Sequence, residues 1–472
     1  MFIQSIPYIH APETYFTPLR ILPYPVWLDS CKPYTDAGRF DILAADPEKI
    51  FIQETTGTLL FTPQGAHQTT EDPLRHLTMD LEQIASQVDT SKIPEIPLPF
   101  YGGYIGFLSY DYGRTLEKIT SYALNDIAWP LLHIARYAWA IIIDHQTKTA
   151  YFVSYLPAKK ALNKYQQIML LLSQAQPSEE FFSLSTPFQG NMSFSEYVTQ
   201  FKTIMTHLRD GDCYQVNFAQ RFQASFVGSP YAAYLKLRQK NPAPFGAYLH
   251  TMHGDILSSS PERFLSLHNG CVETKPIKGT CPRGKTQADD LRLAEGLLSS
   301  EKDRAENIMI VDLMRNDFSR VCLPHTVIVS ALCALESFTN VHHLVSTVQG
   351  KLKQGISAAS LLAATFPGGS VTGTPKVSAM QIIDKLEPHR RQLYCGSIFY
   401  VDIFNNMDSN ITIRTLITSD NRISVYGGGA IVADSNVESE YQESLTKINN
   451  ILELLHEISP LLCKNEELRP SK

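Results

Sequence analysis

Short runs of β-branched and aromatic residues, separated by Pro, Gly and Asp, recur through the first 173 residues of the chain. Such runs predict strands of a mostly antiparallel sheet. The clearest lie at residues 39–45, 50–55, 101–109, 138–144 and 150–155. Residues 174–192 have little periodicity and are rich in Gln, Pro, Ser and Glu, which is typical of a linker. The pattern therefore predicts a first part, residues 1–175, and a second part, residues 190–460.

The second part opens on a predicted helix. Ser193 and Glu196 have the spacing of a capping box, and Gly211 follows the last apolar residue of the helical face. Helices are also predicted at 301–315, 356–365 and 438–456. Strands are predicted at 215–222, 246–250, 255–258, 271–276, 396–403, 409–417 and 423–426. Strands grouped in runs, with helices between the groups, favour the α+β class over a wound parallel sheet.

Composition narrows the function. The chain is 44% hydrophobic and 19% charged, which is enough for a large core, and its formal net charge of −6 argues against nucleic acid as a partner. The eight cysteines form no C-x-x-C pair, so they indicate free thiols in a reducing compartment and no zinc site. Residues 1–19 do not resemble a signal peptide, and the longest apolar stretch, 137–143, is too short to cross a membrane. We expect a cytoplasmic protein.

Two single residues are candidates for proton transfer and nucleophilic chemistry. Lys278 lies in the segment KPIKGT just after a predicted strand. A lysine attacks only when neutral, so work near pH 7 needs a pKa about three units below its usual value of about 10.4. Glu262 follows a proline in SSSPERF and could serve as a general acid. The ordinary alternatives are a surface lysine near a turn and a carboxylate paired with Arg263.

Acidic residues on two predicted helices suit a magnesium ion. Glu306 lies on the first helix, while Glu440, Glu443 and Lys447 share one face of the last. Mg²⁺ is often bound by one or two protein carboxylates together with water and substrate oxygens. A solvated acidic face is the alternative.

Glycine-rich segments occur at 366–370, 372–376 and 427–429 and are predicted to be turns. Successive glycine N–H groups can cradle a carboxylate, although most such segments are only turns. No GxGxxG or Walker A pattern follows a strand, so nucleotide binding is unsupported.

Taken in order, these segments resemble the chorismate-utilising enzymes, a family that includes anthranilate, aminodeoxychorismate, isochorismate and salicylate synthases. The resemblance covers nearly the whole chain. It rests on GDCYQVNFAQR (211–221), SSSPERF (258–264), PIKGT (276–280), RAENIMIVDLMRND (304–317), VHHLVS (341–346), FPGGSVTGTPK (366–376), ITIR (411–414) and residues 427–443. It implies a large two-layer antiparallel β-sandwich with outer helices. Residues 1–175 would form the N-terminal domain shared by the aminating members, and residues 190–460 the chorismate-binding catalytic domain.

Two positions indicate the branch of the family. Lys278 stands where anthranilate-forming relatives have alanine, and Gln215 stands where isochorismate and salicylate synthases have a water-activating lysine. The resemblance therefore implies amination of chorismate to 4-amino-4-deoxychorismate for p-aminobenzoate and folate synthesis. An anthranilate synthase component I, an isochorismate or salicylate synthase, and an inactive paralogue kept as a binding protein are the alternatives. The 472 residues contain no recognisable glutamine amidotransferase segment, so a partner subunit is expected to supply ammonia.

The resemblance also implies roles for individual residues. Lys278 would attack the substrate, Glu262 would act as acid and then base, and His343 would line the ring. Mg²⁺ would bind Glu306, Glu440 and Glu443. Substrate contacts would come from Thr280, Thr372, Gly373, Arg414, Gly427, Gly428, Gly429 and Lys447. A tryptophan pocket would be formed by Ser30, Gly38, Arg39, Phe40, Pro244, Phe245 and Gly246, with ordinary core and turn structure as the alternative.

Overall fold

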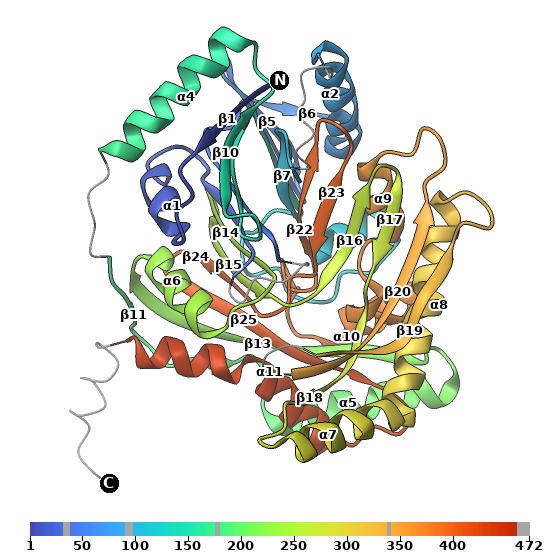
Figure 1. Cartoon of the computed structure of the whole chain (residues 1–472). Helices are drawn as coiled ribbons and strands as arrows, with labels where there is room; N and C mark the ends of the chain where they lie inside the picture. The colour runs from blue at the N-terminus through green and yellow to red at the C-terminus, as the bar shows by residue number, and fades with distance from the viewer. Residues whose placement is uncertain (32–37, 90–97, 175–179, 338–340, 460–472) are drawn as a thin grey trace, which may run out of the picture.

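The computed structural model describes residues 1–31, 38–89, 98–174, 180–337 and 341–459. Two large antiparallel sheets pack against each other, and helices lie outside them (Figure 1), which confirms the predicted fold class. The first sheet runs in the order β1 (Phe2–Ile6), β10 (Thr149–Ser154), β9 (Trp139–Asp144), β3 (Phe40–Ala44), β2 (Val26–Asp29), β14 (Phe245–Thr251), β15 (Gly254–Ser260), β24 (Thr415–Ser419), β25 (Arg422–Ile431), β13 (Gln215–Gly228) and β11 (Phe182–Leu184), with β12 (Gln189–Gly190) and β21 (Gly373–Thr374) also paired to β13.

The second sheet runs in the order β18 (Ile277–Pro282), β20 (Val341–Lys351), β17 (Cys271–Thr274), β16 (Arg263–His268), β23 (Met407–Asn410), β22 (Ser397–Asp402), β7 (Gly103–Leu108), β8 (Leu132–Tyr137), β4 (Lys49–Glu54), β5 (Gly57–Thr62) and β6 (Gly65–Thr69), with β19 (Ile328–Ser337) paired to β20. The helices are α1 (Glu13–Leu19), α2 (Pro73–Gln87), α3 (Gly113–Leu116), α4 (Ala158–Ser173), α5 (Phe194–Asp210), α6 (Pro230–Lys240), α7 (Gln287–Ser299), α8 (Glu301–Val321), α9 (Ala358–Thr365), α10 (Lys376–Leu386) and α11 (Val437–Glu457).

The central strands β3 and β9 of the first sheet are buried on both faces. Side chains alternate along a strand, so Ile42 faces the core between the sheets while Leu43 packs under the outer helices. The same alternation holds in β9, where Ile142 belongs to the inner core and Ile141 to the outer one. This double burial explains why residues 137–143 read as one uninterrupted apolar run. No described helix is long and apolar enough to cross a membrane.

Local signals predicted several elements well. The Ser193 side chain accepts a hydrogen bond from the backbone amide of Glu196, and the Glu196 side chain accepts one from the backbone amide of Ser193, so the capping box is present. Gly211 ends α5 with a φ of 81°. The prediction of one strand at 409–417 was wrong, because β23 and β24 lie there in different sheets. The prediction of a turn at 427–429 was also wrong, because these glycines lie inside β25.

Both predicted parts of the chain contribute strands to both sheets. β2 of the first part pairs with β14 of the second, and β7 pairs with β22. The predicted linker contains β11 and β12, and its residues 175–179 lie outside the described residues. The division of the chain into two domains at residues 175–190 stays a prediction. In the structure, the two predicted parts share both sheets.

Two neighbouring crossovers between the sheets position the site. Glu262 lies at the corner between β15 and β16, and Arg414 lies at the corner between β23 and β24. The amide of Ile411 donates to the carbonyl of Glu262 (3.0 Å), and the amide of Ser259 donates to the carbonyl of Arg414 (3.1 Å). Each corner is therefore tied to the other strand pair, which holds the backbones of Glu262 and Arg414 near one another.

The glycines of β25 let helix α11 lie directly on the strand. A Cβ at Gly427 would overlap the carbonyl oxygen of Ser444 on α11 and would lie 3.2 Å from Ile448 Cδ1. Backbone cannot yield as a flexible side chain would, so any side chain here must push the helix away from the sheet.

We predict that Gly427→Ala lowers the free energy of unfolding by about 2 kcal/mol, because overpacking a tight contact typically costs about 1–3 kcal/mol. Urea denaturation measures the change. Gly296→Ala is the matched control, because that exposed glycine of α7 has open space around its Cβ position. The control should be stabilised by about 0.5–1 kcal/mol, the usual helical gain of alanine over glycine. Equal effects of the two substitutions would contradict the close-packing account.

Candidate functional site

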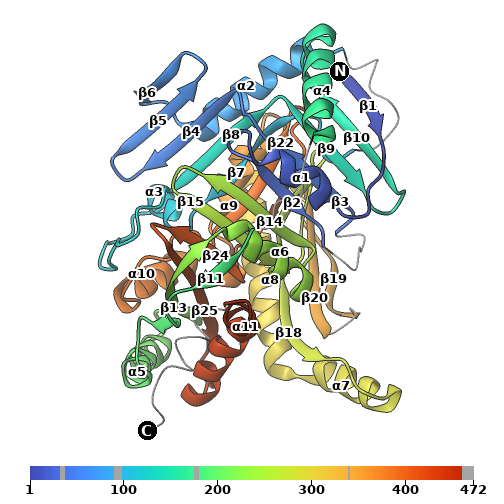
Figure 2. The ribbon, with the colours of Figure 1, turned by 90° about the vertical axis from the view of Figure 1, so that its left-hand side faces the viewer.

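A cavity of about 710 Å³ opens where β18, β25, α8 and α11 meet. Both views of the ribbon place these elements together at the lower end of the molecule (Figures 1 and 2). Most of the predicted site residues line it, although they come from seven separate stretches of sequence. They are Glu262, Lys278, Thr280, Glu306, His343, Arg414, Gly427, Gly428, Glu440, Glu443 and Lys447.

Three predicted residues shape the wall without lining the cavity. The Thr372 hydroxyl donates to the carbonyl of Gly368 (3.0 Å), so it closes its own loop. A Cβ at Gly373 would overlap the carbonyl oxygen of Gln215, so this glycine permits the pairing of β21 with β13. A Cβ at Gly429 would lie 3.2 Å from Glu440 Oε2. These glycines act by letting neighbouring elements approach.

Lys278 and Glu262 are joined through Ser370. The Lys278 amine donates to the Ser370 carbonyl (3.1 Å), and the Ser370 hydroxyl donates to Glu262 Oε1 (2.9 Å). Burial lowers the pKa of Lys278, although the charges of Glu306 and Glu262 oppose the shift. Burial raises the pKa of Glu262, and the charge of Lys278 opposes that shift. Both directions favour the neutral forms, which are the forms that a nucleophilic amine and a general acid need.

His343 lies beside these groups. Its Nδ1 is 2.8 Å from the Thr280 hydroxyl. Burial, together with the charges of Arg414 and His342, lowers the pKa of His343 to about 4. The imidazole is therefore largely neutral at neutral pH and can contact a substrate ring without adding a charge.

The three acids predicted to hold a metal face the same cavity from α8 and α11. Lys302 lies between two of them, 3.5 Å from Glu440 and 4.0 Å from Glu306. Burial raises the pKa of Glu306, whereas Lys447, 2.7 Å from Glu443, outweighs burial and lowers the pKa of Glu443. Within the described part of the chain, no three acidic, His or Cys side chains converge on one metal position. Two carboxylates open to a cavity suit Mg²⁺ that completes its shell with water and substrate oxygens.

Two positive side chains and one backbone amide also face the cavity. Lys447 Nζ donates to the carbonyl of Gly428 (3.0 Å), and the exposed Arg414 side chain lines the same wall. The N–H and C=O of one strand residue point to the same side, so the Gly428 amide faces the cavity while those of Gly427 and Gly429 point toward β13. One amide can therefore meet a carboxylate here, where the sequence had suggested three.

Sequence reasoning missed several residues that line this cavity. Ser370 and Asn217 lie inside the motifs FPGGSVTGTPK and GDCYQVNFAQR, and their polar side chains within these motifs were the available signal. Tyr394 and Tyr426 stack with ring centroids 5.1 Å apart, and no local pattern marked them. Lys302 lies in a predicted helix with many charged residues, and nothing in the sequence distinguished it from them.

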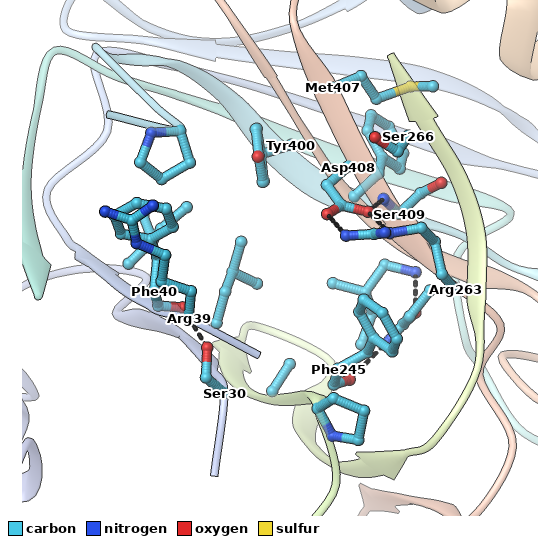
Figure 3. Close-up of a pocket in the computed structure, with 18 of the residues that line it drawn as sticks. Ser30, Arg39, Phe40, Phe245, Arg263, Ser266, Tyr400, Met407, Asp408 and Ser409 are labelled. Atoms are coloured by element: carbon cyan, nitrogen blue, oxygen red, sulfur yellow. Dashed lines mark hydrogen bonds and ion pairs between the residues drawn. The ribbon is translucent and has the colours of Figure 1, made fainter. Parts of the chain in front are cut away.

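A second cavity, of about 360 Å³, lies between the two sheets beside β2 and β14 (Figure 3). Six of the seven residues predicted for a tryptophan pocket line it: Ser30, Arg39, Phe40, Pro244, Phe245 and Gly246. Gly38 does not line it, but a Cβ there would lie 2.9 Å from the Ser30 carbonyl oxygen, so this glycine lets the wall close. Arg263 pairs with Asp408 (2.8 Å) and lies over the Phe245 ring (5.0 Å to its centroid).

Comparisons with known proteins agree over most of the chain. Residues 26–453 match the family described as chorismate binding enzyme. Aminodeoxychorismate synthase component 1 of Salmonella typhimurium is 45% identical over 442 residues, 94% of this chain and 95% of the relative. The protein of the same name from Escherichia coli is 43% identical, with 94% and 96% covered. The crystal structure of anthranilate synthase component I from Streptococcus pneumoniae superposes with a TM-score of 0.78 at 31% identity, covering 88% of this chain and 92% of that one.

Proposed function

Because the chain belongs to the family of chorismate binding enzymes, we propose that it aminates chorismate at C4 to give 4-amino-4-deoxychorismate. This is the reaction expected from relatives named aminodeoxychorismate synthase component 1, and it leads to p-aminobenzoate and folate. The observation that carries the proposal is a partly buried lysine, Lys278, linked through Ser370 to a buried carboxyl group, Glu262.

The proposed reaction has two halves. In the first, the neutral Lys278 amine forms a bond to C2 while the ring double bonds shift and the C4 hydroxyl leaves as water with a proton from Glu262. In the second, ammonia forms a bond to C4, the double bonds shift back, and Lys278 leaves C2. Glu262 takes the proton that the incoming nitrogen loses, and Lys278 regains the proton that it released. The balance is chorismate plus ammonia giving 4-amino-4-deoxychorismate plus water.

The other residues of the cavity are assigned by charge. Glu306 and Glu443, with Glu440 beside them, would hold Mg²⁺, which supplies positive charge for the ring carboxylate and withdraws electrons from the diene. Lys447, Arg414 and the Gly428 amide would hold the second carboxylate. His343 and Thr280 would lie along the ring.

The ammonia source is proposed to be a glutamine amidotransferase subunit. The "component 1" in the names of the relatives supports a second subunit, and both would work in the cytoplasm. The alternatives that form anthranilate or isochorismate are disfavoured by the side chain at Lys278, since a lysine that first occupies C2 blocks substitution there. Gln215 cannot activate water as a lysine would, because an amide does not titrate.

Lys278→Ala is predicted to lower kcat by at least roughly a hundredfold, because the nucleophile is gone. Lys278→Arg should be no better, since guanidinium stays protonated. Wild-type protein given chorismate and Mg²⁺ without ammonia should gain a substrate-derived mass on the peptide that contains Lys278. Lys275→Ala, in the same segment and outside the cavity, is the control and should keep the wild-type rate. An adduct on another residue, or a normal rate in the alanine variant, would refute this role.

Glu306→Gln and Glu443→Gln are each predicted to weaken the response to Mg²⁺, because an amide is a poorer ligand than a carboxylate. Two titrations measure it: activity against Mg²⁺ concentration, and the rise of Tm with Mg²⁺ in the absence of substrate. Glu295→Gln, an exposed acid of α7, is the matched control. Wild-type titrations in both site variants would place the metal elsewhere.

The cavity in Figure 3 is proposed to bind L-tryptophan. Its volume and its aromatic and proline walls suit an indole, and the Ser30 hydroxyl and Arg39 supply polar groups at one side. The Ser30 hydroxyl donates to the Phe40 carbonyl, which fixes that side of the wall.

Tryptophan at concentrations above its Kd should raise Tm, because a ligand that binds only the folded chain stabilises it. Ser266→Phe should abolish this rise, since Ser266 lines the cavity and a phenyl ring would fill it. Gln68→Phe, on the exposed strand β6, should leave the rise intact. Thermal scans of the wild type and both variants at increasing L-tryptophan concentrations measure the change in Tm. If Tm of the wild type does not rise, the cavity is ordinary core structure and not a tryptophan site.

A further inference from the structure

We propose that Ser370 is a positioning residue that keeps Glu262 oriented in both halves of the reaction and aims the amine of Lys278 at the substrate. The inference rests on the proposed function. Its geometric basis is one residue with two contacts: the Ser370 hydroxyl bonds to the acid and the Ser370 carbonyl bonds to the nucleophile.

The loop that carries Ser370 is anchored to β13. The side-chain amide of Asn217 donates to the Val371 carbonyl (2.8 Å), and its backbone N–H donates to the Thr372 carbonyl (2.8 Å). The buried Arg391 also donates to the Val371 carbonyl (3.0 Å), and its own charge is met by Glu387. Three hydrogen bonds on two adjacent residues leave the backbone at Ser370 little freedom.

The other end of the loop is anchored to α8. Lys376, at the start of α10, pairs with the buried Asp317 of α8 (2.8 Å) and donates to the Thr365 carbonyl (2.6 Å). A buried ion pair with an additional hydrogen bond resists displacement, since breaking it leaves an uncompensated charge. The loop is therefore a rigid support for Ser370 on both sides.

The chemistry of a hydroxyl suits a group that must be acid and then base. A hydroxyl can donate to a carboxylate, and after rotation it can accept from a carboxylic acid. A backbone amide can only donate and a carbonyl can only accept, so neither can change from donor to acceptor when Glu262 gains its proton. The Ser370 carbonyl, in turn, accepts one N–H of Lys278, so the lone pair of the neutral amine is not directed at that carbonyl.

Two charged side chains and several uncharged groups surround Glu262. Lys278 on β18 and Lys447 on α11 favour its ionised form, as do the Ser370 hydroxyl and the Ile277 amide. The Cys395 thiol also interacts with Glu262. Burial outweighs these groups and raises the pKa of Glu262. Loss of the Ser370 hydroxyl should therefore raise this pKa further and extend the acid form to higher pH.

The test is the rate of Lys278 adduct formation from chorismate and Mg²⁺ without ammonia, followed by mass spectrometry across pH. Ser370→Ala removes the hydroxyl and keeps the carbonyl that holds Lys278. It should slow the reaction about tenfold, which is part of the roughly 10²–10⁴-fold that a positioned general acid contributes, and move the alkaline limb of the profile to higher pH. Ser370→Thr should restore the wild-type limb. Ser319→Ala, an exposed serine of α8, should match the wild type throughout.

An unmoved limb in Ser370→Ala overturns the proposal, whether or not the rate falls, because a merely structural loss slows the reaction equally at all pH values. A threonine variant that shifts the limb as alanine does also overturns it, since the hydroxyl would not be the cause. If the wild type forms no adduct on Lys278, the covalent mechanism fails instead, so the two failures are distinguishable.

Discussion

The common burial of Lys278 and Glu262 is the constraint on which the site depends. In water the amine would be protonated and the carboxyl group ionised, and neither could do the proposed chemistry. Their shared removal from water shifts both toward the neutral forms, and Ser370 links them without adding a charge. The cost of burying two titratable groups must be met by the rest of the fold, which supplies a large core on each side of the first sheet.

The fold meets that constraint by bringing distant segments very close together. β25 carries glycines, so α11 can lie directly on it and bring its acids and Lys447 to the cavity wall. Crossovers between the sheets place Glu262 and Arg414 at adjacent corners. The cavity therefore carries both signs of charge: α8 and α11 supply its acids, α11 also supplies Lys447, which pairs with Glu443 (2.7 Å), and the corner before β24 supplies Arg414.

The sequence predicted what is local and what is periodic. Ser193, Glu196 and Gly211 specify the ends of α5 within a few residues, and β9 was recognisable because both of its faces are buried. The break within residues 409–417, where the chain passes from β23 in one sheet to β24 in the other, could not be recognised, since a crossover between sheets has no local signature. Glycines 427–429 suggest a turn, because glycine suits both turns and close contacts, and only the position of α11 distinguishes the two. Ser370 contacts residues 92 and 108 positions away, so its place between acid and nucleophile follows from tertiary structure alone.

Product identity tests the central claim most directly. The purified chain, given chorismate, Mg²⁺ and ammonium salt at alkaline pH, should yield 4-amino-4-deoxychorismate as the product resolved by HPLC and identified by mass and NMR. The account requires the new nitrogen on C4, because Lys278 occupies C2 during the first half of the reaction. Anthranilate, isochorismate or salicylate as the main product would contradict it.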